Sequence, residues 1–330
     1  MGATLRHQLG RAKAEGYDLA FLGGQRQRYG YFGFETCGVG YTATFNRSNL
    51  RHFTKAQGPS PLTVAPLRPD DHQKLAAVMA LHAALLIKLD RSAGGTAGFY
   101  RHLVSWRNSP LVATEAATGE VVGLMVVDGG EAAPSGSVTE LLCRAPADAS
   151  RMIQRLLADR APLEGDEGEE AEFKVTLSPA DVGVTTSLGS WAESMTIGSP
   201  SHTSMYAIYN WAPVVDALLK LQFKLAGGPH IKPHGLAIGV VTIELAGVGV
   251  LELSVSEKTA GCKLLKLLQL PDPEAAAVPC QPEGGAALMR ALFGPTPPAL
   301  ALGAGLGPEA ALLLHSWCPL PLFWAPQDGA

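Results

Sequence analysis

The sequence predicts a protein built from α/β and α+β parts, and three observations indicate this. Apolar residues recur at about 3.6-residue spacing over residues 71–89, which is typical of an amphipathic helix. Three strand-like segments follow over residues 111–143, separated by turn signals as in an antiparallel meander. A helix, an apolar hairpin and a further helix then occupy residues 212–292, which is the order of an α+β domain.

The first block predicts a helix over 3–15 that stops at Gly16, a strand over 18–22, a Gly/Arg/Tyr loop over 23–33 and a strand over 39–45. One helix and two strands leave most of their apolar surfaces uncovered. We therefore expect residues before Met1, or segments later in the chain, to cover this block.

The second block begins after a predicted linker over residues 47–60. Asp70 is the expected N-cap of the helix over 71–89, because its carboxylate can accept from the first free backbone N–H groups. Further elements are expected in this order: a helix over 97–106, strands over 111–116, 121–127 and 137–143, a helix over 147–159, a strand over 173–178 and a Gly/Ser/Thr-rich segment over 183–204. The predicted domains are 1–50, 51–205 and 206–330.

Net charge, cysteine spacing and the apolar segments indicate which partners and sites are not expected. A formal net charge of -4 gives no broad basic surface for nucleic acid or for an anionic membrane. The 5 cysteines are scattered and form no Cys-x-x-Cys pair, so neither a disulfide framework nor a zinc site is expected, as in a cytoplasmic protein. The apolar window over 235–255 contains Glu244 and Glu252 and alternates as strands do, so it predicts no membrane span.

The most informative motif lies over residues 29–34, which read Tyr-Gly-Tyr-Phe-Gly-Phe after the strand YDLAFLGG. With the preceding helix, this stretch resembles the later half of a GNAT-superfamily N-acyltransferase domain. In that family an Arg/Gln-x-x-Gly-x-Gly/Ala loop opens the helix and binds the pyrophosphate of acetyl-coenzyme A. The resemblance makes Gly2, Ala3 and Thr4 the last residues of that loop, and it implies an amino-terminally truncated first domain.

The same resemblance implies a role for Tyr29. A tyrosine at this position gives a proton to the thiolate that leaves after acyl transfer. The alternative is that Tyr29 and its aromatic neighbours only pack a glycine-rich turn against the sheet.

The second block also resembles a GNAT domain in LTVAPLRPDDH and in its meander. After the strand over 137–143, however, the sequence reads RAPADASRMIQ, which contains a proline and no glycine. We therefore expect a GNAT-like fold without a cofactor site.

Two such domains before a sterol-carrier-like α+β domain are the arrangement of the enhanced-intracellular-survival acetyltransferases. That resemblance implies a symmetric homo-oligomer. It also makes the carboxylate of Ala330 the general base.

The expected function is transfer of an acetyl group from acetyl-coenzyme A to a primary amine, on a small molecule or a lysine side chain, without a metal. Two alternatives stay open. One is a non-catalytic protein that holds a hydrophobic ligand in the sterol-carrier-like domain, and the other is an inactive fragment.

Overall fold

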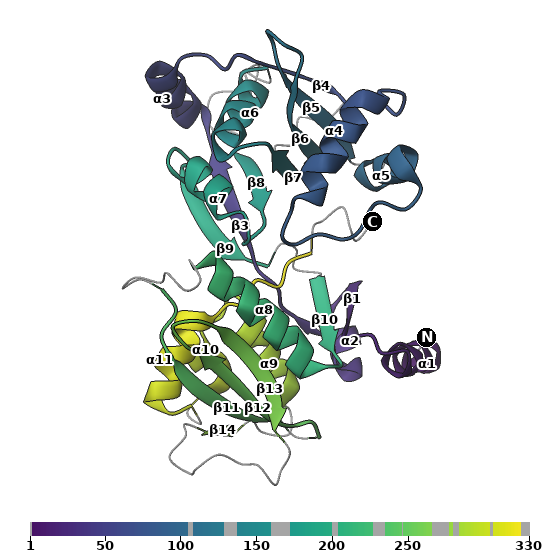
Figure 1. Cartoon of the computed structure of the whole chain (residues 1–330), viewed down its shortest axis with the longest axis vertical. Coiled ribbons are helices and arrows are strands. Elements are labelled where there is room, and N and C mark those ends of the chain that lie inside the picture. The colour runs from purple at the N-terminus through teal and green to yellow at the C-terminus, as the bar shows by residue number, and fades with distance from the viewer. Residues whose placement is uncertain are drawn as a thin grey trace. The chain divides into compact units, whose positions relative to one another are not determined.

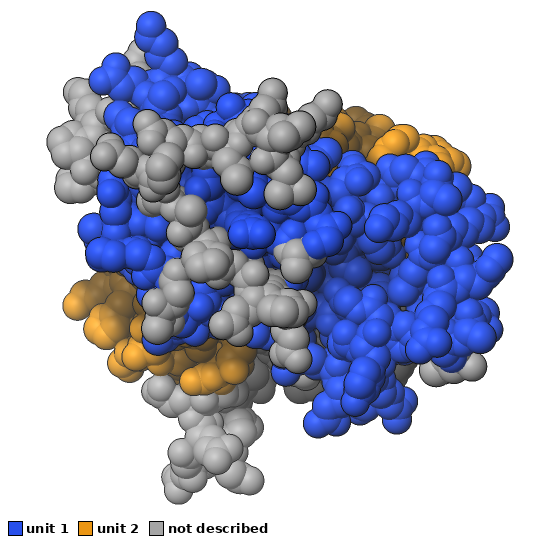
Figure 2. Space-filling view, turned by 90° about the horizontal axis from the view of Figure 1, so that it is seen from below, with its two compact units in different colours: residues 1–39, 201–322 blue, residues 40–200, 323–330 orange. Residues whose placement is uncertain are grey.

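The computed structural model distributes helices and sheets over two units (Figure 1). Unit 1 comprises residues 1–39 and 201–322, and unit 2 comprises residues 40–200 and 323–330 (Figure 2). Both units combine helices with sheets, which confirms the mixed α/β prediction. The three-domain division stays a prediction. The structure describes residues 2–104, 108–128, 137–159, 172–199, 204–226, 235–245, 247–265, 277–279, 284–303 and 306–324.

Unit 2 is organised around one mixed sheet with the strand order β4-β5-β6-β7-β8-β3-β9. All neighbours are antiparallel except β7 and β8, which run parallel. The strands are β3 (Gly40–Phe45), β4 (Leu62–Pro66), β5 (Asn108–Glu115), β6 (Val121–Asp128), β7 (Ser137–Cys143), β8 (Phe173–Leu177) and β9 (Ser194–Gly198). The helices are α3 (Arg47–Gln57), α4 (His72–Ala83), α5 (Gly95–Leu103), α6 (Pro146–Asp159) and α7 (Val182–Gly189).

Both faces of this sheet are covered, because successive side chains of a strand point to opposite faces. On β6, Met125 packs in a core with Met152 of α6, whereas Leu124 packs in a second core with Leu75 of α4 and Phe99 of α5. All five side chains are at most 1 % exposed. Burial on both faces explains why β6 reads as one continuous apolar run.

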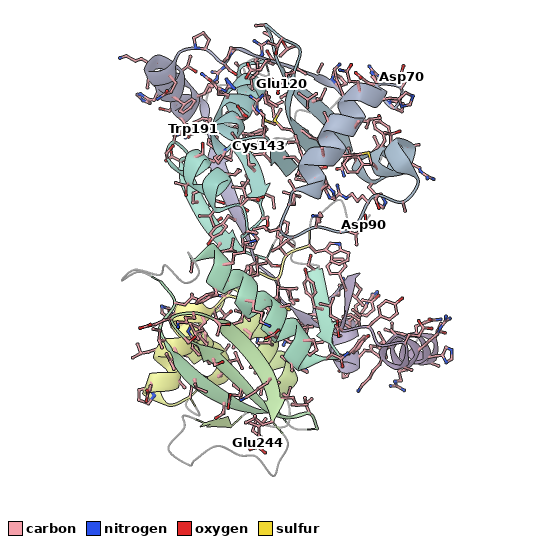
Figure 3. The ribbon with its side chains drawn as sticks, in the orientation of Figure 1. Asp70, Asp90, Glu120, Cys143, Trp191 and Glu244 are labelled. Carbon is pink, nitrogen blue, oxygen red and sulfur yellow. The ribbon has the colours of Figure 1, made fainter. Side chains whose placement is uncertain are left out.

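The structure corrects several local predictions in unit 2. The predicted linker over 47–60 is mostly helix α3, which Asn46 caps by accepting from Asn49 N while the Asn49 side chain accepts from Asn46 N. Helix α4 ends at Ala83, and its N-cap is Asp71 rather than Asp70. The Gly/Ser/Thr-rich segment contains helix α7 and strand β9. Helix α3 is held by Phe53, whose ring stacks on Trp191 with centroids 4.4 Å apart (Figure 3).

Unit 1 contains two sheets. In the first, β10 lies between β1 and β2 and is antiparallel to both, so a strand from late in the chain covers the first block. The second sheet has the order β13-β12-β11-β14. The strands are β1 (Leu19–Gly23), β2 (Glu35–Thr36), β10 (Ser204–Ile208), β11 (Gly239–Leu245), β12 (Gly249–Val255), β13 (Ala260–Leu265) and β14 (Ala277–Pro279).

In unit 1, α1 (Gly2–Ala14), α8 (Trp211–Leu225) and α9 (Gly284–Phe293) lie at predicted helix positions. The predicted loop over 23–33 instead contains the short helices α2 (Arg26–Tyr29) and η1 (Gly30–Phe32), and the sequence predicts neither α10 (Pro298–Leu302) nor α11 (Pro308–Trp317). Helix α8 is tied to β13 by a hydrogen bond of 3.0 Å from Cys262 N to the Asp216 carboxylate. Over the described ranges, no helix combines the length and apolar character needed to cross a lipid bilayer.

Candidate active site

The segment over residues 24–34, called the Tyr29 turn below, joins β1 to β2 in unit 1. Helix α2 passes directly into η1, which ends at Phe32. The C-cap residue Gly33 has a φ of 84°, a left-handed conformation that favours glycine. The Tyr29 ring is half-buried and meets Phe34 edge-on, with centroids 6.4 Å apart. A Cβ atom on Gly24 would lie 2.3 Å from Tyr29 Cε2, so only glycine leaves room for the ring at that position. The contacts with Phe34 and Gly24 therefore fix the position of the Tyr29 ring.

The amino end of α1 packs against the same turn. A Cβ atom on Gly2 would lie 3.7 Å from the Phe32 ring, and the Arg6 guanidinium lies 5.7 Å from the centroid of that ring. The structure therefore brings Gly2 close to the segment that carries Tyr29. Ala3 and Thr4 are exposed, and the first turn of α1 carries no acidic residue.

These features fit the binding of a phosphate group at α1. The first N–H groups of a helix have no partner within the helix and lie at the positive end of its dipole. Small side chains at Gly2 and Ala3 leave the backbone accessible, and the Thr4 hydroxyl adds a donor. The remaining predicted site residue, Ala330, lies outside the described residues, so its role stays a prediction.

A buried carboxylate forms a second polar centre beside the Tyr29 turn, and the sequence analysis did not find it. Glu35 begins β2 and is 2 % exposed. It accepts from Arg26 Nε at 2.5 Å, Arg26 Nη2 at 2.9 Å, Arg290 Nη1 at 2.6 Å and Thr36 N at 3.0 Å. The carboxylate raises the pKa of the Arg26 guanidinium, chiefly through their hydrogen bonds. The guanidinium groups of two arginines therefore pair with one carboxylate.

This centre lines an open groove of about 690 Å³ in unit 1. The Tyr29 turn supplies Tyr31 and Phe34 to its wall, and helices α8 and α9 supply Trp211 and Met289. Arg26 and Glu35 add the charged part of the lining. The groove therefore combines apolar and aromatic walls with a few polar groups, the usual composition of a small-molecule site.

Unit 2 offers a cleft at the carboxyl ends of its two parallel strands, but that cleft is closed. Strands β7 and β8 pair only at Ser137 with Lys174 and at Val138 with Val175. Beyond this point the space between them contains the ion pair of Arg91 and Glu140, and the remaining cavity measures about 30 Å³. A volume of that size admits only about two water molecules.

The helix that follows β7 also lacks a place for phosphate. Cys143 ends β7 (Figure 3), and α6 begins three residues later at Pro146, which has no N–H to donate. Asp148 lies in the first turn, 3 % exposed, where its carboxylate pairs with Arg144 and Arg151 and already stabilises the helix end. The expectation that this part of the chain has no cofactor site stays a prediction.

The described cysteines provide no nucleophile for a covalent acyl intermediate. Burial raises the pKa of the Cys143, Cys262 and Cys318 thiols to about 12, and it also raises the pKa of Cys37. These thiols are protonated at neutral pH and therefore weak nucleophiles. Among the residues that the structure describes, no cluster of histidine, cysteine and acidic side chains could hold a metal ion.

Comparison with solved structures assigns the fold. The chain superimposes on a GCN5-related N-acetyltransferase from Kribbella flavida with a TM-score of 0.52 and 17% identity, over 95% of this chain and 71% of that one. It has the fold of GCN5-related N-acetyltransferases. A second such protein, from Anabaena variabilis, gives a TM-score of 0.52 and 15% identity, over 98% and 75% of the two chains.

A third neighbour, a conserved protein of unknown function from Enterococcus faecalis described as a probable N-acyltransferase, gives a TM-score of 0.50 and 13% identity, over 98% and 74% of the chains. No protein-family profile and no curated protein sequence matches the chain. The likeness is therefore one of fold.

Proposed function

We propose that the chain is an N-acyltransferase that moves the acetyl group of acetyl-coenzyme A to a primary amine, on a small molecule or a lysine side chain. Its active centre would lie in unit 1, at the Tyr29 turn. The observation that carries the proposal is the packing of Gly2 against Phe32, which puts the amino end of α1 beside the turn that contains Tyr29. The shared acyltransferase fold supports the reaction type.

In this proposal the backbone N–H groups of Gly2, Ala3 and Thr4 hold the pyrophosphate of acetyl-coenzyme A. The amine nitrogen forms a bond to the thioester carbonyl carbon as the carbon–sulfur bond breaks. The Tyr29 hydroxyl gives its proton to the departing sulfur, and the nitrogen loses one proton to a base. The products are an amide and the free thiol of coenzyme A, so no oxidant is needed.

Glu35 is unsuited to serve as that base. A carboxylate accepts about four hydrogen bonds, and Glu35 already accepts four from Arg26, Arg290 and Thr36. The carboxylate of Ala330 remains the base that the family resemblance implies.

The acyltransferase-like part of unit 2 would be structural, because its cleft and its α6 helix end are occupied by Arg91, Glu140 and Asp148. We further propose that the β13-β12-β11-β14 sheet and its helices form the sterol-carrier-like domain, and that the protein is a homo-oligomer in the cytoplasm.

Calorimetric titration with acetyl-coenzyme A, followed by thiol release with a panel of amines, tests the proposal. Tyr29→Phe should lower kcat by about 10²-fold or more while the affinity for acetyl-coenzyme A changes little. Tyr17→Phe is the matched control, since Tyr17 is 58% exposed between α1 and β1. Equal rates for the two variants would reject the role of Tyr29. Failure to bind acetyl-coenzyme A would favour an inactive fragment, or a hydrophobic-ligand carrier if a fluorescent fatty acid binds instead.

A further inference from the structure

The charged centre at the unit 1 groove exposes guanidinium groups rather than its carboxylate. The Glu35 side chain is 3% exposed, whereas the side chains of Arg26 and Arg290 are 61% and 34% exposed. Arg26 lines the groove, and Arg290 contacts Glu35 from outside the lining, so a molecule that enters the groove meets mainly the Arg26 guanidinium.

The charges of this cluster favour an anion. Two guanidinium groups and one carboxylate leave one net positive charge. Glu35 has no acceptor site left for an ammonium group, because its four hydrogen bonds use both oxygens twice. Each guanidinium has five N–H donors, and the bonds to Glu35 use two of Arg26 and one of Arg290. The remaining donors can bind a carboxylate or a phosphate.

Glu35 also fixes where those donors are. Its bidentate contact with Arg26 and its contact with Arg290 hold two long side chains that would otherwise be flexible. Such preorganisation reduces the entropy that binding costs. The neighbouring wall is aromatic, with Tyr31 88% exposed and Trp211 also in the lining, so a planar group can pack beside the anion.

We propose that the groove binds the acceptor substrate, and that this acceptor is an amine whose molecule also carries an anionic group, a carboxylate or a phosphate. Arg26 recognises this group, and Arg290, bound to the same carboxylate of Glu35, adds positive charge. The inference rests on the proposed function, because it assigns the groove to the acceptor. Its location follows from the lining, since Gly30, Tyr31 and Phe34 of the Tyr29 turn belong to the groove wall.

Binding of matched amines tests this without any turnover. Calorimetry in the absence of acetyl-coenzyme A would compare 4-(aminomethyl)benzoate with benzylamine, which differ only in the carboxylate. The carboxylate should improve affinity at least about ten-fold, as expected for one charge-assisted hydrogen bond. Equal binding, or no binding of either amine, would overturn the proposal whether or not the chain acetylates anything.

Substitutions of Arg26 test whether this side chain binds the carboxylate of the acceptor. Arg26→Gln should abolish the advantage of the carboxylate, and Arg26→Lys should retain part of it, because lysine keeps the charge without the planar fork. Arg28→Gln is the control, since Arg28 is exposed on the same short helix and is not part of the groove lining. Circular dichroism would verify folding, which the exposure of Arg26 should preserve. A carboxylate advantage that survives in Arg26→Gln would contradict the assignment.

The phosphates of acetyl-coenzyme A are also anionic groups of the kind that arginine side chains bind. Coenzyme A and dephospho-coenzyme A differ by one phosphate, so both would be titrated into the Arg26→Gln protein. Unchanged affinities for both support recognition of the acceptor. Loss of affinity for coenzyme A alone would show that the arginines bind that phosphate, and it would overturn the acceptor assignment.

Discussion

Arg91 and Glu140 form an ion pair in the interior of unit 2, with Arg91 Nη1 3.1 Å and 3.0 Å from the two carboxylate oxygens. Arg91 precedes α5, and Glu140 lies on β7 directly after Thr139, where the register between β6 and β7 shifts. Their side chains are 0% and 6% exposed. The pair therefore lines the cleft beyond the point where β7 and β8 cease to pair.

Removal of one partner of this pair should destabilise unit 2 strongly. Glu140→Gln leaves the Arg91 charge buried without its counter-charge, and we expect a loss of about 3 kcal/mol in the free energy of unfolding. The double variant Arg91→Met with Glu140→Leu should lose clearly less than the single variants Arg91→Met and Glu140→Leu together, because it removes both charges. Urea denaturation of these variants and of the natural protein measures the differences.

An exposed ion pair on α6 serves as the control. Arg155 and Asp159 are 40% and 38% exposed, so Asp159→Asn should change stability by less than about 0.5 kcal/mol. Strict additivity of the Arg91 and Glu140 substitutions would show that the two charges do not stabilise each other.

Local signals predicted much of the fold. Helix α1 ends near Gly16, and the meander β5-β6-β7 follows from alternating apolar runs and turns. Helix α3 differs from the predicted linker because its sequence is polar, as linkers are, although Asn46 with Asn49 forms a capping box and Gly58 follows its end. These cap signals were present in the sequence.

Long-range relationships could not be predicted in this way. Strand β10 lies between β1 and β2, although more than 160 residues separate it from either strand. The contact of Glu35 with Arg290 joins residues 255 positions apart. Neither residue belongs to a recognisable motif, so only the folded chain shows that Glu35 pairs with both Arg290 and Arg26.

A methyl group at Gly24 should displace the Tyr29 ring. In Gly24→Ala the new Cβ would lie 2.3 Å from Tyr29 Cε2, and we expect a destabilisation of about 1–3 kcal/mol from overpacking. If the proposed function is correct, turnover should also fall. Gly23→Ala is the matched control, because a Cβ there meets nothing within 4 Å. Thermal unfolding that shifts equally in the two variants would contradict the packing of Tyr29 on Gly24.

Helix α1 should gain stability when Gly10 is replaced by alanine. Gly10 lies in the interior of the helix, is exposed, and would place a Cβ in open space. Alanine restricts the unfolded chain and favours the helix, so Gly10→Ala should stabilise unit 1 by about 0.5–1 kcal/mol. Gly123→Ala in β6 should do the opposite, since its Cβ would lie 2.4 Å from the Leu142 carbonyl oxygen. A destabilised Gly10→Ala protein would indicate that α1 is not helical there.

Asp181, at the amino end of α7, should make unit 2 less stable as pH rises. Burial raises its pKa from 3.8 to about 6, so between these values the folded chain binds more protons than the unfolded chain. The free energy of unfolding therefore falls through this range, by at most about 3 kcal/mol, and stays lowered above it. Asp181→Asn cannot ionise, so it should match the natural protein near pH 4 and exceed its stability at pH 7. Urea denaturation of both proteins at several pH values measures the difference, and a difference independent of pH would show that Asp181 is well solvated in the folded chain.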